Sequence, residues 1–121
     1  MLDGGICDPI PFRKACEDGY DRMVLVLTRN KGYRKEEKEV KLPPFFYHKY
    51  PALKNRLYHR MREYNKTMDE IEMMEKNNKA IVIRPQKPLV VDRIERNIKK
   101  LTDLYEEGYH CAEAVFSAVN L

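Results

Sequence analysis

The residues that most suggest chemistry stand at the start of the chain, where Asp3 is followed by Gly4 and Gly5. Glycine tolerates positive φ and lets other atoms approach its backbone, so the tripeptide predicts a sharp turn that presents Asp3 outside any regular element. A carboxylate held in this way can take the proton of a serine hydroxyl directly, as a general base. Most Asp-Gly pairs are ordinary turns, so the tripeptide gains weight only from the sequence around it.

A second set of candidate residues is basic and follows the first predicted strand: Arg29, Lys31 and Arg34. Ligands of α/β sheets usually bind beyond the carboxyl ends of the strands. These three side chains are therefore candidates to face a ligand such as a phospholipid headgroup. A structural salt bridge or a solvated loop explains them at least as well.

Histidines and cysteines show no catalytic or metal-binding pattern. They are His48, His59, His110, Cys7, Cys16 and Cys111. His110 and Cys111 are adjacent, but neighbours in a helix point about 100° apart and so do not face each other. The cysteines contain no CxxC pair and are expected to be reduced thiols. No set of side chains has metal-ligand spacing, so no metal is expected.

The elements that would position Asp3 follow in the order helix, then strand. A short helix is predicted over residues 11–18, because proline stands at its start and Gly19 follows its end. Residues 23–27 form an apolar run without polar alternation, which predicts a strand buried on both faces, as in a parallel sheet covered by helices. Residues 80–83 predict a second strand of the same kind. This order is typical of an α/β layered domain.

The clearest helix signal spans residues 51–76. Its apolar residues recur at helical spacing and form one stripe: Leu53, Leu57, Met61, Tyr64, Met68 and Ile71. After the second strand, Asp92 is predicted to cap a further helix that Gly108 interrupts, and residues 112–119 are predicted to form a separate short helix. The sequence thus predicts two strands and about four helices.

Two strands leave unpaired sheet edges, and buried parallel strands normally lie among several others. The pattern therefore predicts one side of a larger α/β sheet. Folded alone, such a chain is expected to self-associate through its exposed edges.

Composition and charge narrow the class of protein. No apolar run among the 121 residues approaches the roughly 20 needed to span a bilayer, and the N-terminus lacks a secretory signal, so a cytoplasmic location is expected. Residues 29–66 hold twelve Lys or Arg against four Glu, within a net charge of +4. Such a block can contact anionic lipid at the membrane periphery or nucleic acid, but a solvated helix face explains it too. It lacks the motifs of a nucleic-acid module, so no nucleic acid is expected.

Several strings along the chain form one joint pattern. They are Asp3-Gly4-Gly5-Ile6-Cys7-Asp8-Pro9-Ile10-Pro11, Gly19-Tyr20-Asp21, Val24-Leu25-Val26-Leu27, Thr28-Arg29-x-Lys31-Gly32-Tyr33-Arg34-Lys35, Ala80-Ile81-Val82-Ile83-Arg84-Pro85, Pro88-Leu89, Arg93 and Leu101-x-x-Leu104-Tyr105-x-x-Gly108-Tyr109. This pattern, which covers essentially the whole chain, resembles the C-terminal part of bacterial patatin-like phospholipases of the long cytosolic subgroup.

The resemblance implies a serine acyl hydrolase that uses a Ser-Asp dyad on ester bonds of lipids, without a cofactor. Asp3 matches the aspartate of that dyad, and Gly4 and Gly5 match the glycines that shape its turn. The implied fold is part of a patatin-like three-layer α/β sandwich. Residues 1–42 would be the C-terminal end of the catalytic core, and residues 43–121 a helical C-terminal extension.

The sequence lacks the family's nucleophile. In that family the serine lies in a Gly-x-Ser-x-Gly turn, and a Gly-rich loop upstream of it supplies the oxyanion hole. The single serine here, Ser117, has no flanking glycines and a helical setting. We therefore expect the N-terminal catalytic half in the same polypeptide, and no hydrolase activity in the isolated chain. The alternative is a non-catalytic module that binds anionic lipid, nucleic acid or a protein partner through residues 29–66.

Overall fold

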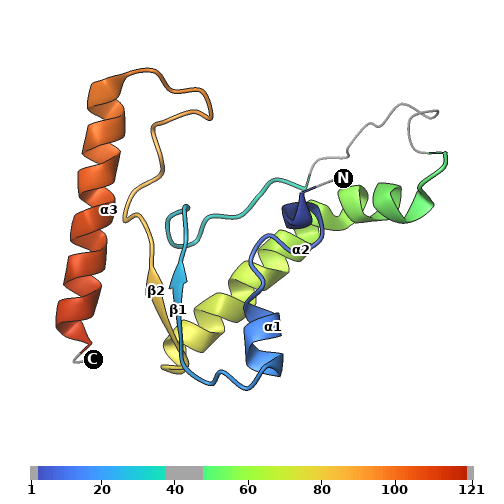
Figure 1. Ribbon diagram of the computed structural model, residues 1–121, viewed down its shortest axis with the longest axis horizontal. Coiled ribbons are helices and arrows are strands. Elements are labelled where there is room, and N and C mark those ends of the chain that lie inside the picture. The colour runs from blue at the N-terminus through green and yellow to red at the C-terminus, as the bar shows by residue number, and fades with distance from the viewer. Residues whose placement is uncertain (1–2, 38–47, 120–121) are drawn as a thin grey trace. The chain divides into compact units, whose positions relative to one another are not determined.

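The computed structural model describes residues 3–37 and 48–119 (Figure 1). Its elements are, in order, the 3-10 turn η1 (Gly4–Ile6), α1 (Phe12–Glu17), β1 (Met23–Val26), α2 (Pro51–Lys76), β2 (Ala80–Ile83) and α3 (Ile98–Ala118). The fold is mixed α/β with two parallel strands, which confirms the predicted α/β class. The chain divides into two compact units, and each is described by itself. They are Met1–Tyr20 with Arg34–Met74, and Asp21–Tyr33 with Glu75–Leu121.

In the first unit, α1 ends as its sequence predicts. Gly19 adopts a positive φ of 91°, which a residue with a side chain rarely reaches. The Tyr20 N–H then donates to the Ala15 carbonyl at 3.1 Å, and the Gly19 N–H donates to the Cys16 carbonyl at 3.1 Å. These two bonds satisfy carbonyls that the end of a helix otherwise leaves unpaired. The predicted helix and its glycine stop are confirmed.

The long helix α2 begins at Pro51 and ends at Lys76, the bounds that the sequence predicts. Asn78 follows with a positive φ of 55° and turns the chain out of the helix. The side chains of the apolar stripe are buried to different extents along the helix. Met68 and Ile71 are fully buried, whereas Leu53 and Leu57 near the start of α2 are only half-buried. The core of this unit therefore lies along the C-terminal half of α2.

The second unit is built on the two strands, which pair in parallel from Met23 opposite Ala80 to Val26 opposite Ile83. In β2 every residue is buried or half-buried, as predicted. In β1 the prediction of a strand buried on both faces is wrong, because Val24 is 44% and Val26 73% exposed. Val24 and Val26 lie on the same face of the sheet, so this face of β1 is not covered by the described residues.

The helix α3 contacts β2 within this unit and runs without a break from Ile98 to Ala118. Its N-cap is Asn97, whose side chain accepts from the Lys100 N–H at 3.2 Å, so the predicted cap at Asp92 is wrong. The predicted interruption at Gly108 is also wrong. One glycine costs a helix about 1 kcal/mol relative to alanine, which a helix of 21 residues tolerates. Three α-helices are therefore present in the described residues, where about four were predicted.

The predicted domain boundary between residues 42 and 43 lies outside the described residues. No helix that the structure describes is both long and apolar enough to cross a membrane.

Candidate functional site

Asp3 lies at the N-cap of η1, immediately before its first residue. Its Oδ1 atom accepts a hydrogen bond from the Gly5 N–H at 2.6 Å, and its backbone carbonyl accepts from the Ile6 N–H at 3.1 Å. The backbone of Asp3 is extended, with φ −63° and ψ 132°, so the side chain folds over the start of the turn. The Asp3 side chain is exposed. The turn therefore fixes one carboxylate oxygen and leaves the group accessible.

The two glycines of the turn have different roles. Both lie in the 3-10 turn, and neither has the positive φ that the sequence suggested. A Cβ on Gly5 would lie 3.0 Å from Asp3 Oδ1, closer than the carboxylate can accept without moving. A Cβ on Gly4 would meet open space. A side chain at position 5 would thus force the Asp3 carboxylate to shift, and one at position 4 would not.

A carboxylate with one fixed oxygen can act as a proton acceptor through the other. Within residues 3–37 and 48–119 the Asp3 side chain makes no hydrogen bond or ion pair apart from that with Gly5. Ser117 lies in the last turn of α3, where it is exposed. It therefore has the helical setting expected from the sequence, not the strained turn of a nucleophile.

Arg34 is bound by two carboxylates of α2. Its Nη2 atom donates to Asp69 Oδ1 at 2.6 Å and to Glu72 Oε2 at 3.1 Å, and its Nη1 atom donates to Glu72 Oε1 at 3.2 Å. The hydrogen bonds to Glu72, followed by those to Asp69, raise the pKa of the Arg34 guanidinium. This planar two-point contact is what arginine forms best with carboxylates. The structure thus places Arg34 in an internal ion-pair network.

The residue after Arg34 extends this attachment. The Lys35 N–H donates to Asn65 Oδ1 at 2.8 Å, and the Asn65 amide donates back to the Lys35 carbonyl at 2.9 Å. The Lys35 ammonium lies 4.0 Å from the centre of the Tyr64 ring, a cation–π contact. The segment that begins at Arg34 is therefore anchored along α2.

Arg29 and Lys31 belong to the second unit and also have partners there. The Arg29 guanidinium lies 5.0 Å from the centre of the Tyr33 ring. Lys31 Nζ lies 3.7 Å from Glu75 Oε2, which also pairs with Arg84. Arg84 is 7% exposed, and Lys31 is 71% exposed. Of the three predicted ligand-facing cations, Arg29 and Lys31 thus share a unit, and Arg34 lies in the other.

A further ion pair, which the sequence analysis did not single out, joins α1 to α2 in the first unit. Arg13 Nε donates to Glu70 Oε2 at 2.8 Å. The hydrogen bond from Arg13 lowers the pKa of the Glu70 carboxyl, and the same bond raises the pKa of Arg13. The signal that could have found these pairs is the cluster of carboxylates in one part of α2: Asp69, Glu70, Glu72 and Glu75.

The histidines and cysteines form no reaction centre in the part of the chain that the structure describes. Cys7 and Cys16 are exposed free thiols, and Cys111 is a half-buried one. His110 Nδ1 lies 3.5 Å from Glu113 on the same helix. No group of three His, Cys, Asp or Glu side chains among residues 3–37 and 48–119 is placed to hold a metal ion.

The family of the chain follows from its C-terminal part. Residues 50–120, which include α2, β2 and α3, match the family described as Domain of unknown function (DUF6363). The chain therefore belongs to the DUF6363 family. No curated protein and no solved structure matches it.

Proposed function

We propose that the chain is the C-terminal part of a patatin-like lipid acyl hydrolase, in which Asp3 is the base of a Ser-Asp dyad. The observation that carries the proposal is the hydrogen bond from the Gly5 N–H to Asp3 Oδ1 at 2.6 Å, at a glycine where an added Cβ would lie only 3.0 Å from that oxygen. An ordinary Asx turn makes the same hydrogen bond, so the bond supports the assignment only together with the downstream sequence pattern.

In this reaction Asp3 accepts a proton and donates it again in each of two half-reactions. The serine hydroxyl, supplied by a Gly-x-Ser-x-Gly turn in the N-terminal half of the same polypeptide, gives its proton to Asp3 as its oxygen attacks the ester carbonyl. The protonated Asp3 then gives that proton to the departing alcohol, and an acyl-enzyme remains. Asp3 next takes a proton from the water that attacks the acyl group and gives it to the serine oxygen as the bond between serine and acyl group breaks, so that the fatty acid is released and the serine hydroxyl is restored. Gly5 holds one oxygen of Asp3 throughout.

The sheet supports the view that these strands are part of a larger, patatin-like three-layer sandwich. β1 leaves Val24 and Val26 exposed, which is unusual for a parallel strand. Beside it lies a hollow with a volume of about 580 Å³, lined in part by Met23, Ala80 and Val115. Further strands and helices of the same polypeptide would bury this apolar surface. In this proposal residues 1–42 end the catalytic core and residues 43–121 form an extension, which contains the family match at 50–120.

The first test uses an aryl ester of a short-chain acid. The isolated chain is expected to show no turnover above an Asp3→Asn control. A longer polypeptide, read from the upstream DNA and containing the Gly-x-Ser-x-Gly turn, is expected to be active. In that enzyme Asp3→Asn should lower kcat by about 10²–10⁴-fold, since it removes the general base. Asp8→Asn removes a nearby exposed carboxylate and is the matched control. Equal losses in both variants would contradict the role of Asp3.

The two glycines provide a second test of the same geometry. Gly5→Ala should lower kcat by about 10²-fold, because its Cβ displaces the carboxylate from its position. Gly4→Ala introduces the same methyl group into open space and should leave kcat within about twofold. Full activity in Gly5→Ala would remove the observation on which the proposal rests.

A second candidate function, a non-catalytic binding module, is favoured by the cations on α2 that make no salt bridge in the part of the chain that the structure describes. It predicts salt-dependent binding to an anionic partner that Asp3→Asn does not change, together with no ester hydrolysis by the longer polypeptide.

A further inference from the structure

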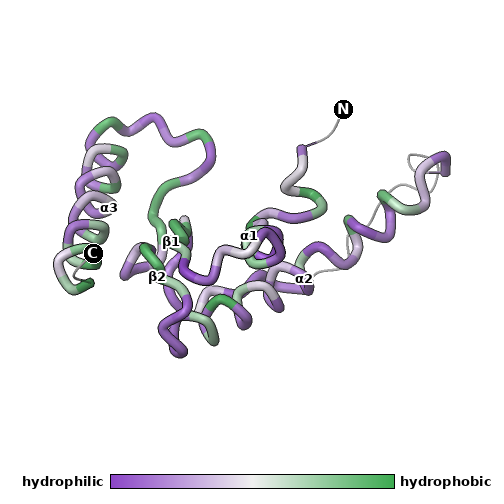
Figure 2. Tube along the Cα trace, turned by 60° about the horizontal axis from the view of Figure 1, so that its bottom comes forward, coloured by the Kyte–Doolittle hydropathy of each residue, from purple (hydrophilic) through white to green (hydrophobic). Residues whose placement is uncertain are grey.

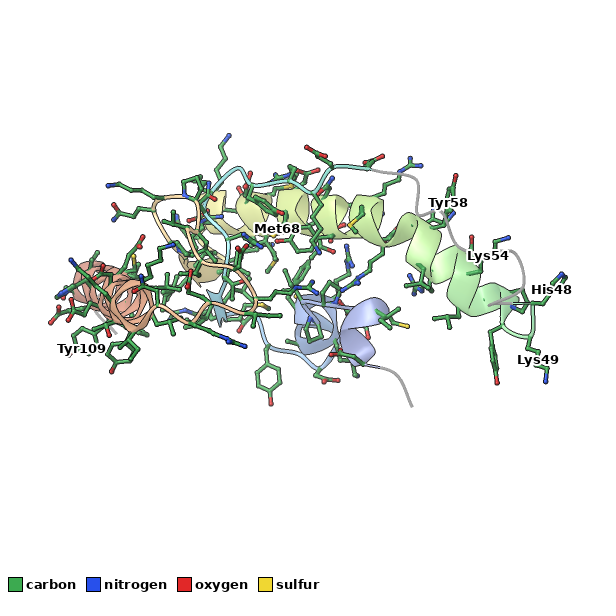
Figure 3. The ribbon with its side chains drawn as sticks, turned by 90° about the horizontal axis from the view of Figure 1, so that it is seen from above. His48, Lys49, Lys54, Tyr58, Met68 and Tyr109 are labelled. Atoms are coloured by element: carbon green, nitrogen blue, oxygen red, sulfur yellow. The ribbon has the colours of Figure 1, made fainter. Side chains whose placement is uncertain are left out.

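Four side chains between residues 54 and 66 of α2 form a basic stripe: Lys54, Tyr58, Arg62 and Lys66. They recur every four residues, and residues at this spacing are neighbours on one helix face. All four are exposed. Figure 3 shows Lys54 and Tyr58 leaving the same side of α2. At about 1.5 Å per residue the stripe is about 18 Å long.

Ion pairing does not account for the basic stripe. Across the described ranges 3–37 and 48–119, Lys54, Arg62 and Lys66 make no salt bridge. Lys66 acts on Glu70 through its charge, which adds to the larger effect of Arg13 in lowering the pKa of the Glu70 carboxyl. The three cations therefore remain available to an outside anion.

Three other cations of segment 29–66 differ from those of the stripe, because they have partners within the chain. Arg34 is held by two carboxylates, Lys35 lies on the Tyr64 ring, and Lys31 pairs with Glu75. Among the described cations of this segment, Lys31, Arg34 and Lys35 thus have partners within the chain, whereas the cations of the stripe face outward.

Helix stability does not account for the stripe either. The N-terminal end of a helix carries a partial positive charge, so acidic residues stabilise it and basic residues destabilise it. The first turn of α2 contains no acidic residue, and Lys54 is the fourth residue of the helix. The charge of Lys54 thus acts against the helix that carries it, which favours a role of this residue in binding.

We propose that the basic stripe docks the protein on an anionic membrane surface, with α2 lying along the headgroups. Each Lys or Arg near such a surface strengthens binding about fivefold. Tyr58, which is 50% exposed between Lys54 and Arg62, and Tyr50, which is 63% exposed, have the amphipathic rings that sit at headgroup depth. The choice of lipid over nucleic acid rests on the proposed function, because a lipid hydrolase must reach its substrate in a bilayer.

The test compares two variants of the full chain with equal charge change. One replaces the three cations of the stripe with glutamine (Lys54→Gln, Arg62→Gln, Lys66→Gln). The control makes the same change at Lys87, Arg93 and Lys99, which are exposed residues of the second unit. Wild type should co-sediment with vesicles of phosphatidylcholine and phosphatidylglycerol, but not with phosphatidylcholine alone. The stripe variant should bind about a hundredfold more weakly, and the control less than tenfold more weakly.

Three outcomes of the sedimentation experiment would overturn the proposal. They are equal binding of wild type to both kinds of vesicle, equal losses in the two triple variants, and stronger stripe-dependent binding to a duplex or single-stranded oligonucleotide than to vesicles. Asp3→Asn should leave vesicle binding unchanged. The docking test therefore reports on the stripe alone, and the esterase test on Asp3 alone.

A fluorescent reporter locates the docking surface. The chain has no tryptophan, so Tyr58→Trp introduces a single emitting residue. Its emission should shift to the blue when phosphatidylglycerol vesicles are added, because the ring leaves water. Tyr109→Trp places the same reporter on α3, where Tyr109 is 60% exposed, and should not shift. A shift at residue 109 without one at residue 58 would show that α3 docks and the stripe does not.

Discussion

The two halves of α2 belong to one helix but meet different surroundings. In the C-terminal half, Thr67, Met68 and Ile71 are buried. In the N-terminal half, from Pro51 to Glu63, no residue is buried, and the apolar residues are half-buried at most. Figure 2 shows hydrophilic residues recurring along the N-terminal half. Tertiary packing therefore begins only part of the way along the helix.

The charges also change along α2, with a boundary a few residues later, so that residues 51–66 form a basic half and residues 67–76 an acidic half. Residues 51–66 carry five Lys or Arg and one Glu, whereas residues 67–76 carry four Asp or Glu and one Lys. Each of the four carboxylates pairs with a basic residue from outside the helix: Asp69 and Glu72 with Arg34, Glu70 with Arg13, Glu75 with Arg84 and Lys31. The acidic half is thus neutralised inside the chain, whereas the basic half makes no salt bridge within residues 3–37 and 48–119. Helical periodicity predicts where a helix lies. Which part of the helix is packed and paired, and which part faces solvent, depends on the side chains that contact it.

The largest expected difference between the halves is in packing. Met68→Ala should lower the free energy of unfolding by about 2–5 kcal/mol, since Met68 is fully buried and alanine leaves a cavity. Leu57→Ala removes a half-buried side chain and should cost clearly less, about 1 kcal/mol. Urea denaturation followed by circular dichroism measures both. Similar losses would show that the N-terminal half is as firmly packed as the C-terminal half.

The acidic half should also make stability depend on pH. Arg13 lowers the pKa of the Glu70 carboxyl in the folded chain below its ordinary value of 4.5. A lowered folded pKa means that the pair stabilises the fold above pH 4.5 and that this contribution is lost as the pH falls through the folded pKa.

The measurement is the urea midpoint of wild type and of Arg13→Gln between neutral pH and pH 3. Stability should fall less steeply in Arg13→Gln, and the two proteins should converge at the acid end. The pair is partly exposed, so the difference should be modest and should shrink with added salt. Arg62→Gln is the control from the basic half and should follow wild type. A curve for Arg13→Gln parallel to that of wild type would show that the pair does not couple to folding.

Local signals account for what could be predicted of the fold. The stop of α1 at Gly19, the bounds of α2 and the strand at Ala80–Ile83 depend on residue preferences within a few positions. The exposure of β1 and the continuity of α3 through Gly108 do not, because they depend on how many elements surround a strand and on how much a whole helix tolerates. Sequence patterns report these only indirectly.

In the candidate site, too, local sequence predicts some features, and others depend on contacts in three dimensions. The Asp-Gly-Gly string predicts a turn at Asp3, but the crowding that a Cβ at position 5 would meet depends on the position of Asp3 Oδ1, which residue preferences do not predict. Arg34 was placed among ligand-facing cations because it follows a strand. Its carboxylates lie 35 and 38 residues further along the chain, so its ion pairs could be found only in three dimensions.

The smallest expected effect is on the stability of α2. It is compared with the effect of the same substitution on binding to anionic vesicles. Lys54→Glu places a negative charge near the positive end of the helix and should raise the free energy of unfolding by about 0.3–1 kcal/mol. The same change should weaken sedimentation with phosphatidylglycerol vesicles more than Lys54→Gln does, because it adds repulsion to the loss of an attraction. Arg56→Glu, off the stripe, should weaken it less. If Lys54→Glu stabilises the helix and binding is unchanged, the basic charge at residue 54 has no part in docking. If Lys54→Glu both stabilises the helix and weakens vesicle binding, then Lys54 lowers the stability of α2 and its positive charge serves binding to an anionic surface.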